Sequence, residues 1–432
     1  MAFVFKFTHC QHLSYVINRE NNHLIFTLAI GKHKIGYSVY ISYTLRLADN
    51  MNDTRRLSNN TRTLLDDESV IRRIFDHIDN NTTDMGSECW QEPVGHYQSQ
   101  TYFEAELSVL RKQFTIYCPS SALEGPGAYS TSHVYGIPIV VVRTKDGTAK
   151  AFRNACRHRG VQVAEGCGHT KSFVCPYHAW TYGLDGSLRG VPHEHGFPEL
   201  DKSQRGLVPI DCKEENGLIF VCIDGQDAAI ENELLSNTIG LIPETHRVHQ
   251  TLSVELPANW KIVLESFLEG YHIRATHTDT FFPLQFDNLN VVEQFGRNSR
   301  LCFPYRAVEK LRSKPASSWN VDLSLTYVYH LFPNILISNH PGFKAVVILE
   351  PVAVDRTKQT TYIVTGVDAD DTDNLALVDS ALAVVNAAID EDRQVIMSGQ
   401  RGLAANANQH LEFGLFESSI VHFHSTMKSL RY

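Results

Sequence analysis

Two short segments of the chain each place one cysteine beside one histidine. Cys156 and His158 are separated by one residue, and sixteen residues later Cys175 and His178 are separated by two. Two thiolates and two imidazoles could hold a structural zinc ion, although zinc fingers usually carry both cysteines on one turn and both histidines on a helix. The set also fits a [2Fe–2S] cluster in which two cysteines bind one iron and two histidines bind the other. We favour the cluster, because each segment carries one ligand of each kind.

A second group of candidate ligands comprises Glu269, His272 and His277. The sequence predicts one helix over Trp260–His277, on which the two histidines would point about 140° apart. A helix end or a π-bulge must therefore lie between them if both bind one ion. Two histidines and one carboxylate leave open positions on Fe(II), where O2 can bind beside a substrate. The alternative is two helix histidines with separate roles.

The third ligand must come from elsewhere, and Asp390, Glu391 and Asp392 are the candidates. They lie on a predicted helix over Asn374–Gly399, whose buried stripe is Leu382, Val385, Ile389 and Ile396. At 100° per residue, Asp392 lies within roughly 40° of the stripe centre, Asp390 about 120° away and Glu391 about 140° away. A carboxylate that faces a core needs a cation. We therefore predict Asp392 as the ligand and the other two as surface carboxylates.

The elements around these residues predict two domains. Val134–Arg143 and Ala149–Arg153 read as a hairpin closed by Asp146-Gly147, and a second Asp-Gly turn occurs at Asp185-Gly186. Asp-Gly favours such turns because it tolerates positive φ. This region is a small antiparallel β domain. The following region combines strands with long helices and indicates an α+β domain.

These residues resemble the motifs of the Rieske non-heme iron oxygenases, in particular their large (α) terminal oxygenase subunit. The family patterns NxCxHRG and CPYHxWxYxxxG occur here as NACRHRG and CPYHAWTYGLDG, and NWKxxxExxxExYHxxxxH is matched almost throughout. The ED…QxGL pattern occurs as Glu391-Asp392…Gln400-Arg-Gly-Leu403. Ser266 departs from the Asn of many relatives. The resemblance runs from about residue 100 to the C-terminus and implies a Rieske [2Fe–2S] domain plus a helix-grip α+β catalytic domain.

The resemblance also implies cofactors and partners. Each subunit would carry one [2Fe–2S] cluster, held by the cysteine–histidine segments, and one Fe(2+), held by His272, His277 and Asp392. Glu269 would link His272 to His178 of the partner subunit, which requires a cyclic oligomer, a homotrimer. Electrons would come ultimately from NAD(P)H through a reductase or ferredoxin and would be used with O2 on a small-molecule substrate.

We expect residues 1–85 to be an N-terminal extension and linker with a short helix, residues 86–250 to be the Rieske domain with flanking segments, and residues 251–432 to be the catalytic domain. Residues 1–50 lie outside the resemblance, and Ile35–Leu47 alternates weakly like a strand. They read as a translated upstream segment before Met51, as a degenerate targeting segment or as an added strand.

Composition excludes several other classes. The 432 residues carry a net charge of -9, which argues against a nucleic-acid or anionic-membrane partner. No apolar run approaches the roughly 18 residues of a membrane span; Val134–Val142 is among the longest. Nine cysteines argue against a disulfide scaffold and favour a reducing cytoplasm.

The substrate is not encoded in a motif. Phe281, Phe282, Leu284 and Phe286 follow the histidine pair and are candidates for a pocket wall or for plain core. Aromatic walls stack on aromatic substrates and also bind quaternary ammonium groups. We expect aromatic ring hydroxylation. The alternatives are a choline-, betaine- or carnitine-type monooxygenase, an N- or O-demethylase, a Rieske electron carrier without oxygenase activity, and a zinc-bound interaction module.

Overall fold

The computed structural model describes residues 13–20, 23–30, 33–34, 64–225 and 236–430. The chain divides into two compact units, Met1–Arg56 and Leu57–Tyr432. The described part of the first unit is an antiparallel sheet in the order β1-β2-β3, with bounds Leu13–Glu20, His23–Ile30 and His33–Lys34. The strand expected over Ile35–Leu47 lies outside the described residues.

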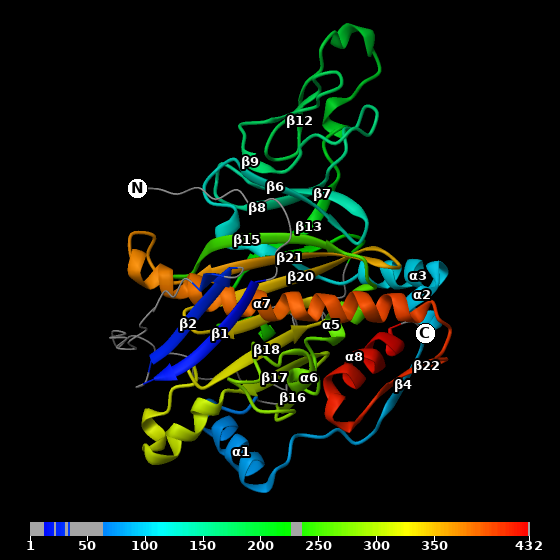
Figure 1. The fold of residues 1–432 in the computed structure, drawn as a ribbon. Helices are drawn as coiled ribbons and strands as arrows, with labels where there is room; N and C mark the ends of the chain where they lie inside the picture. The colour runs from blue at the N-terminus through cyan, green and yellow to red at the C-terminus, as the bar shows by residue number, and fades with distance from the viewer. Residues whose placement is uncertain (1–12, 21–22, 31–32, 35–63, 226–235, 431–432) are drawn as a thin grey trace. The chain divides into compact units, whose positions relative to one another are not determined.

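The smaller sheet of the second unit has seven antiparallel strands in the order β5-β14-β13-β8-β7-β6-β9. Their bounds in chain order are Thr115–Pro119, Ala128–Val134, Ile137–Arg143, Ala149–Arg153, Cys167–His169, Pro209–Glu215 and Leu218–Cys222. A three-stranded sheet, β10-β11-β12, extends this β domain, with bounds Phe173–Val174, Thr181–Tyr182 and Leu188–Gly190. Figure 1 shows β6, β7 and β8 side by side in this smaller sheet.

Both expected Asp-Gly turns are present. Gly147 (φ 86°) lies between β7 and β8, and Gly186 (φ 82°) lies between β11 and β12. Glycine adopts positive φ without steric cost. A Cβ on Gly186 would also lie 2.3 Å from Cε1 of Phe152, so packing requires glycine at this position as well. The cysteine–histidine segments follow β8 and β10 and are therefore anchored by these hairpins.

The larger sheet has seven antiparallel strands in the order β15-β21-β20-β19-β18-β17-β16. Their bounds in chain order are Arg247–Leu256, Val291–Phe295, Asn298–Pro304, Leu325–Leu331, Ile335–His340, Phe343–Ala353 and Arg356–Thr365. Helices α5, α6, α7 and α8 accompany it, with bounds Trp260–Glu265, Ile273–Thr276, Thr372–Leu403 and Ser418–Ser429. Together the two sheets and these helices confirm the α+β fold class.

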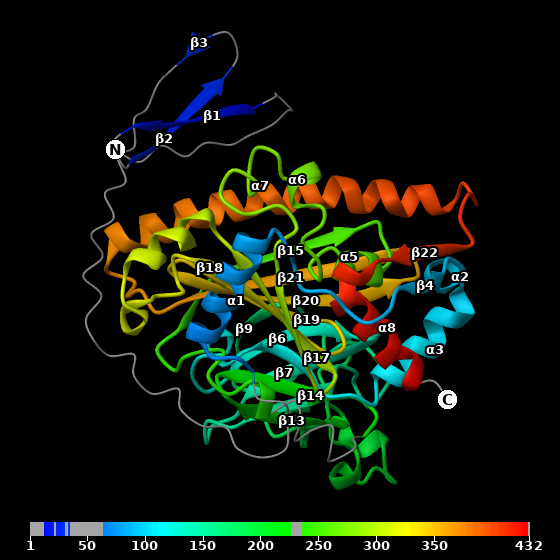
Figure 2. The same cartoon turned by 90° about the horizontal axis from the view of Figure 1, so that it is seen from below.

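Helix α7 is longer at both ends than the predicted Asn374–Gly399. Its N-cap is Asp371, whose side chain accepts from the backbone N–H of Asn374 at 3.2 Å. By length and mean hydropathy it could cross a membrane, and it is the one such helix in the described ranges. Only 17% of its most apolar stretch is buried, although Leu382 and Ile396 pack in the core beside the sheet. Figures 1 and 2 show α7 running along the larger sheet, with α6 beside it.

Residues 64–99 pack on the larger sheet and its helices. Helix α1, Asp67–Asn80, buries an apolar face made of Val70, Ile71, Ile74 and Phe75. This face packs in one cluster with Val291 and Tyr327 of the larger sheet. Strand β4, Trp90–Pro93, pairs with β22, His410–Phe413. The end of the expected linker and the start of the expected Rieske region therefore lie against the catalytic part, because their apolar residues complete its core.

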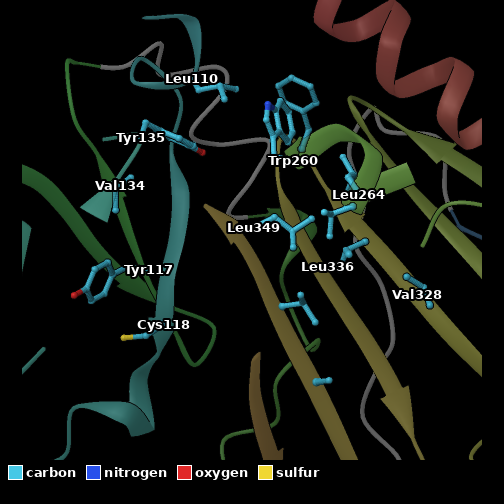
Figure 3. Packing of buried hydrophobic residues seen from close by; sticks show 14 of the residues in the cluster. Leu110, Tyr117, Cys118, Val134, Tyr135, Trp260, Leu264, Val328, Leu336 and Leu349 are labelled. Carbon is cyan, nitrogen blue, oxygen red and sulfur yellow. The ribbon is translucent and has the colours of Figure 1, made fainter. Parts of the chain in front are cut away.

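The two sheets of the second unit share a continuous core. Figure 3 shows Tyr117, Val134 and Tyr135 from the smaller sheet and its β6–β7 turn, which belong to the same buried cluster as Leu336 and Leu349 of the larger sheet. Polar bonds cross the same junction. The Tyr135 hydroxyl donates to Oδ1 of Asn334 at 3.0 Å, and the Gly136 N–H donates to Oε1 of Glu350 at 3.1 Å.

Candidate metal centres

The structure brings the four residues of the cysteine–histidine segments together. Cys156 and Cys175 lie in one buried cluster of the β domain. The imidazole rings of His158 and His178 have centroids 4.7 Å apart. Both cysteines are buried in the β domain, whereas His178 is exposed. Two thiols on the inner side and two imidazoles on the outer side fit a [2Fe–2S] cluster with its histidine-bound iron toward solvent.

Neighbouring aromatic residues fix these ligands. The Tyr182 hydroxyl lies 3.2 Å from Sγ of Cys156 and accepts from the N–H of Arg157 at 2.9 Å. The Trp180 ring stacks on His158 with centroids 4.9 Å apart and planes 8° apart. Hydrogen bonds to ligand sulfur and packing around the cluster are the means by which a protein sets its potential.

The protonation of these groups also fits the cluster. Burial raises the pKa of the Cys175 thiol, so a thiolate there requires a cation to stabilise it. Burial lowers the pKa of His158, and the nearby His178 lowers it further. The pKa of His158 therefore favours the neutral imidazole, which is the form that binds a metal.

The second group converges on Asp392. Its Oδ1 lies 3.0 Å from Nε2 of His277 and 3.5 Å from Nε2 of His272. The nearest ligand atoms of the three residues all lie within 4.8 Å of one another. The side chain of Asp392 is only 12% exposed. A part-buried cluster of two imidazoles and one carboxylate fits a divalent cation such as Fe(II), which would keep open positions for O2 and substrate.

A break in the helix makes this convergence possible. The single helix predicted over Trp260–His277 is wrong, because α5 ends at Glu265 and α6 spans only Ile273–Thr276. His272 and His277 cap the two ends of α6, so both rings can face one point. Gly270 lies in the connection, and a Cβ there would meet Oδ1 of Asn290 at 2.2 Å. The helix end that the histidine spacing required is present at His277, the C-cap of α6, whose φ of -101° and ψ of 38° are not helical.

Each imidazole is held on its other nitrogen by a carboxylate. Glu269 Oε1 contacts Nδ1 of His272, and Glu391 Oε2 lies 2.9 Å from Nδ1 of His277. A carboxylate only accepts hydrogen bonds, so Nδ1 carries the proton and Nε2 keeps its lone pair for a metal. Burial by itself would lower the pKa of His272, but its hydrogen bond to Glu269 and the charges of Glu269 and Asp392 raise this pKa overall. The same negative charge stabilises a bound cation.

The helical phase of α7 agrees with the observed positions of Asp392 and Asp390 but not with that of Glu391. Asp390 is 68% exposed and pairs with Arg393 at 2.7 Å, as a surface carboxylate should. Glu391 is 32% exposed and bonds to His277. The prediction that Glu391 is a surface carboxylate is wrong, because its longer side chain reaches back around the helix to the ring.

Of the four apolar residues after the histidine pair, Phe281 lies beside the site. Its ring centroid is 5.1 Å from that of His277. Phe282 and Phe286 both lie under the guanidinium of Arg306, at 5.4 and 5.2 Å. Phe286 also packs with the cluster that contains α1. Phe281 therefore has a described contact with a proposed metal ligand and is the strongest candidate for the pocket wall.

Residues 113–201 match the family of the Rieske [2Fe-2S] domain, and residues 243–430 match the ring hydroxylating alpha subunit (catalytic domain). Together the two matches cover more than half of the chain. The chain belongs to the α subunits of the Rieske-type ring-hydroxylating oxygenases. The family binds a [2Fe–2S] cluster and a mononuclear iron, and both constellations described above lie within the matched residues.

The names of two curated relatives of this Rieske oxygenase chain refer to quaternary ammonium substrates. The carnitine monooxygenase oxygenase subunit of Acinetobacter baumannii is 32% identical over 233 residues, which cover 50% of this chain and 62% of that protein. The chloroplastic choline monooxygenase of Spinacia oleracea is 25% identical over 345 residues, which cover 77% of this chain and 76% of that protein. The match to the carnitine enzyme thus spans less than two thirds of that relative.

Solved structures show the same fold. The quaternary ammonium Rieske monooxygenase CntA in complex with L-carnitine superposes with a TM-score of 0.68 at 23% identity. The superposition covers 86% of this chain and all of CntA. At this identity the likeness establishes the fold and leaves the substrate to other evidence.

Proposed function

We propose that this chain is the terminal component of a Rieske monooxygenase that hydroxylates a quaternary ammonium compound. The observation that carries the proposal is the convergence of His272, His277 and Asp392 on one point in a chain whose named relatives use carnitine and choline. The expectation of an aromatic substrate receives no comparable support from those names. The reaction inserts one oxygen atom of O2 into a C–H bond, and the other leaves as water with two electrons and two protons.

The cofactors would supply the redox chemistry, and the chain supplies their positions. Bound at the two sites, a [2Fe–2S] cluster delivers single electrons, and Fe(II) offers open positions at which O2 can react. Glu269 and Glu391 orient the two imidazoles, and Asp392 provides the anionic ligand. His277 is buried, and His272 and Asp392 are only 21% and 12% exposed, so the chain would limit the access of bulk water to a bound metal.

We infer that electrons pass between subunits of a homotrimer. In this proposal Glu269 connects His272 to His178 of the partner subunit. Two exposed features support it. His178 and the neighbouring Tyr177, which is 53% exposed, lie on the outer side of the cluster loops, and Tyr271, next to the Glu269–His272 pair, is 60% exposed. Both redox sites therefore reach the surface of a single chain.

Phe281 is the residue that we assign to the substrate cation. A quaternary ammonium group cannot donate a hydrogen bond, so aromatic faces are its best partners. The Phe281 ring lies against His277, which would place a bound trimethylammonium group close to the metal. The electron donor would be a reductase or ferredoxin. Eight free cysteines among the described residues are consistent with a reducing compartment such as the cytoplasm.

Substrate-dependent oxygen uptake tests this function. Purified iron-loaded protein is supplied with NADH and a surrogate reductase, and O2 consumption and product mass are followed together. Carnitine, choline and glycine betaine form one panel, and naphthalene and benzoate form the other. The proposal predicts coupled turnover with a member of the first panel. Turnover confined to the aromatic panel would reject the substrate class and keep the oxygenase.

A further inference from the structure

Glu391 makes two hydrogen bonds with a single oxygen. Its Oε2 lies 2.9 Å from Nδ1 of His277 and accepts from the hydroxyl of Thr280 at 2.6 Å. His277 is 1% exposed, so its ring has little freedom to find another partner. The adjacent Asp392 reaches Nε2 of the same ring at 3.0 Å. Consecutive residues of α7 thus hold both nitrogens of one imidazole.

This arrangement affects the His277 ring in three ways. The carboxylate of Glu391 selects the tautomer, because it can only accept and so keeps the proton on Nδ1. The contact also fixes the rotation of the ring about its Cβ–Cγ bond. Finally, a negative partner makes the opposite nitrogen a stronger donor toward a metal. Glu269 does the same for His272, but from the neighbouring loop, whereas Glu391 acts from the helix that bears Asp392.

The second bond connects the metal site with the segment that follows it. Thr280 directly precedes Phe281, whose ring lies 5.1 Å from that of His277. The backbone of this turn bonds to His277 as well, since the N–H groups of Thr280 and Phe282 donate to its carbonyl at 3.2 and 3.0 Å. Helix α7, the ligand and the turn that carries Phe281 therefore form one hydrogen-bonded unit around Glu391.

We propose that Glu391 is a positioning residue with two separable effects: through His277 it sets the affinity for the mononuclear metal, and through Thr280 it sets the position of Phe281 for the substrate. The substrate effect rests on the proposed function. The metal effect rests only on the geometry of the site. Asp390 provides the contrast on the same turn of α7, because its described ion pair is with Arg393 at the surface.

Metal affinity is measured on full-length protein that retains its cluster and has been depleted of mononuclear iron. Co(II) alone is the probe, with bound metal determined by equilibrium dialysis and its geometry by EPR, since the oxidised cluster is diamagnetic. We expect Glu391→Ala to weaken Co(II) binding by roughly 10- to 100-fold, the range for loss of a group that orients a metal ligand. Glu391→Gln should recover most of the affinity because its amide oxygen still accepts from Nδ1. Asp390→Ala should bind as the wild type does.

Thr280→Val separates the two effects. It removes the hydroxyl and keeps the shape, so Co(II) affinity should stay within about twofold of wild type while KM for the best substrate rises and kcat changes less. If Glu391→Ala folds only in part, judged by its cluster spectrum, Glu391→Leu replaces it, because leucine fills similar volume without an acceptor. Wild-type Co(II) affinity and EPR line shape in the folded Ala or Leu variant would overturn the proposal. Failure of every quaternary ammonium substrate in the wild type would instead overturn the proposed function and leave the metal result standing.

Discussion

Oδ1 of Asp392 lies 3.0 Å from Nε2 of His277, and the two residues come from helices that are far apart in sequence. This contact between a largely buried carboxylate and the nitrogen of a proposed metal ligand marks the centre of the proposed site. A cation between them would compensate the burial of the carboxylate, which is otherwise costly.

Removal of Asp392 should therefore empty the mononuclear site alone. In Asp392→Ala two neutral imidazoles remain, and these hold Fe(II) weakly, so iron should fall from about three to about two atoms per chain. Iron analysis together with the cluster's visible spectrum measures this, and product formation should be lost. Asp390→Ala is the matched control, since its carboxylate lies at the surface. Full mononuclear iron in the Asp392 variant would show that another residue supplies the ligand.

Loss of either cluster thiolate should remove the cluster and spare the second site. Cys156→Ser and Cys175→Ser each take one of the two sulfur ligands from the same iron. Low-temperature EPR after dithionite reduction should lose the rhombic signal in both variants. Cys167→Ser serves as a control, because this exposed cysteine lies outside the ligand set. An unchanged signal in either ligand variant would contradict the assignment.

Glu269→Gln should slow electron transfer and leave both metal centres in place. The amide still accepts a hydrogen bond, but it lacks the charge that raises the pKa of His272. We expect the single-turnover rate of cluster oxidation to fall by roughly 10- to 100-fold. Rapid-mixing absorbance of the reduced protein with substrate and O2 reports this rate. A wild-type rate would remove Glu269 from the electron path.

The junction between the two sheets should make stability depend on pH. Burial raises the pKa of Glu350 from 4.5 to about 8. Between these values the unfolded state loses a proton that the folded state keeps, so stability falls as pH rises from about 4.5 to about 8. Thermal unfolding of Glu350→Gln should show a flatter pH profile over this window. Its amide keeps the acceptor for the N–H of Gly136. Parallel profiles for the two proteins would show that Glu350 does not titrate in this range.

The sequence predicts those features that depend on local geometry. The inward position of Asp392 could be predicted because α7 is a long regular helix. The angle about the helix axis therefore separates Asp392 from Asp390. Both Asp-Gly turns could be predicted because a positive φ restricts the residue type. The four proposed cluster ligands could be recognised because each cysteine–histidine pair lies within one loop.

Features that depend on long-range packing were not predictable. The apolar pattern continues past Glu265, so it gives no sign that α5 ends there. The Cβ of Glu391 points away from the buried stripe of α7. The position of its carboxylate follows only from that of His277, to which it is hydrogen-bonded. The buried Lys261 donates to Glu106 at 2.7 Å, a partner from a different part of the chain. Such pairs form because the fold buries both charges together, which local periodicity does not encode.

We expect this chain to hold a cluster of two irons and a separate mononuclear iron at His272, His277 and Asp392. The 57Fe Mössbauer spectrum of the dithionite-reduced protein distinguishes the two kinds of iron. We expect about two parts of cluster iron to one part of high-spin Fe(II) with nitrogen and oxygen ligands, and no change in the cluster component when Asp392 is replaced by Ala. A spectrum with cluster iron alone in fully loaded wild-type protein, or a colourless protein that carries zinc, would contradict this expectation.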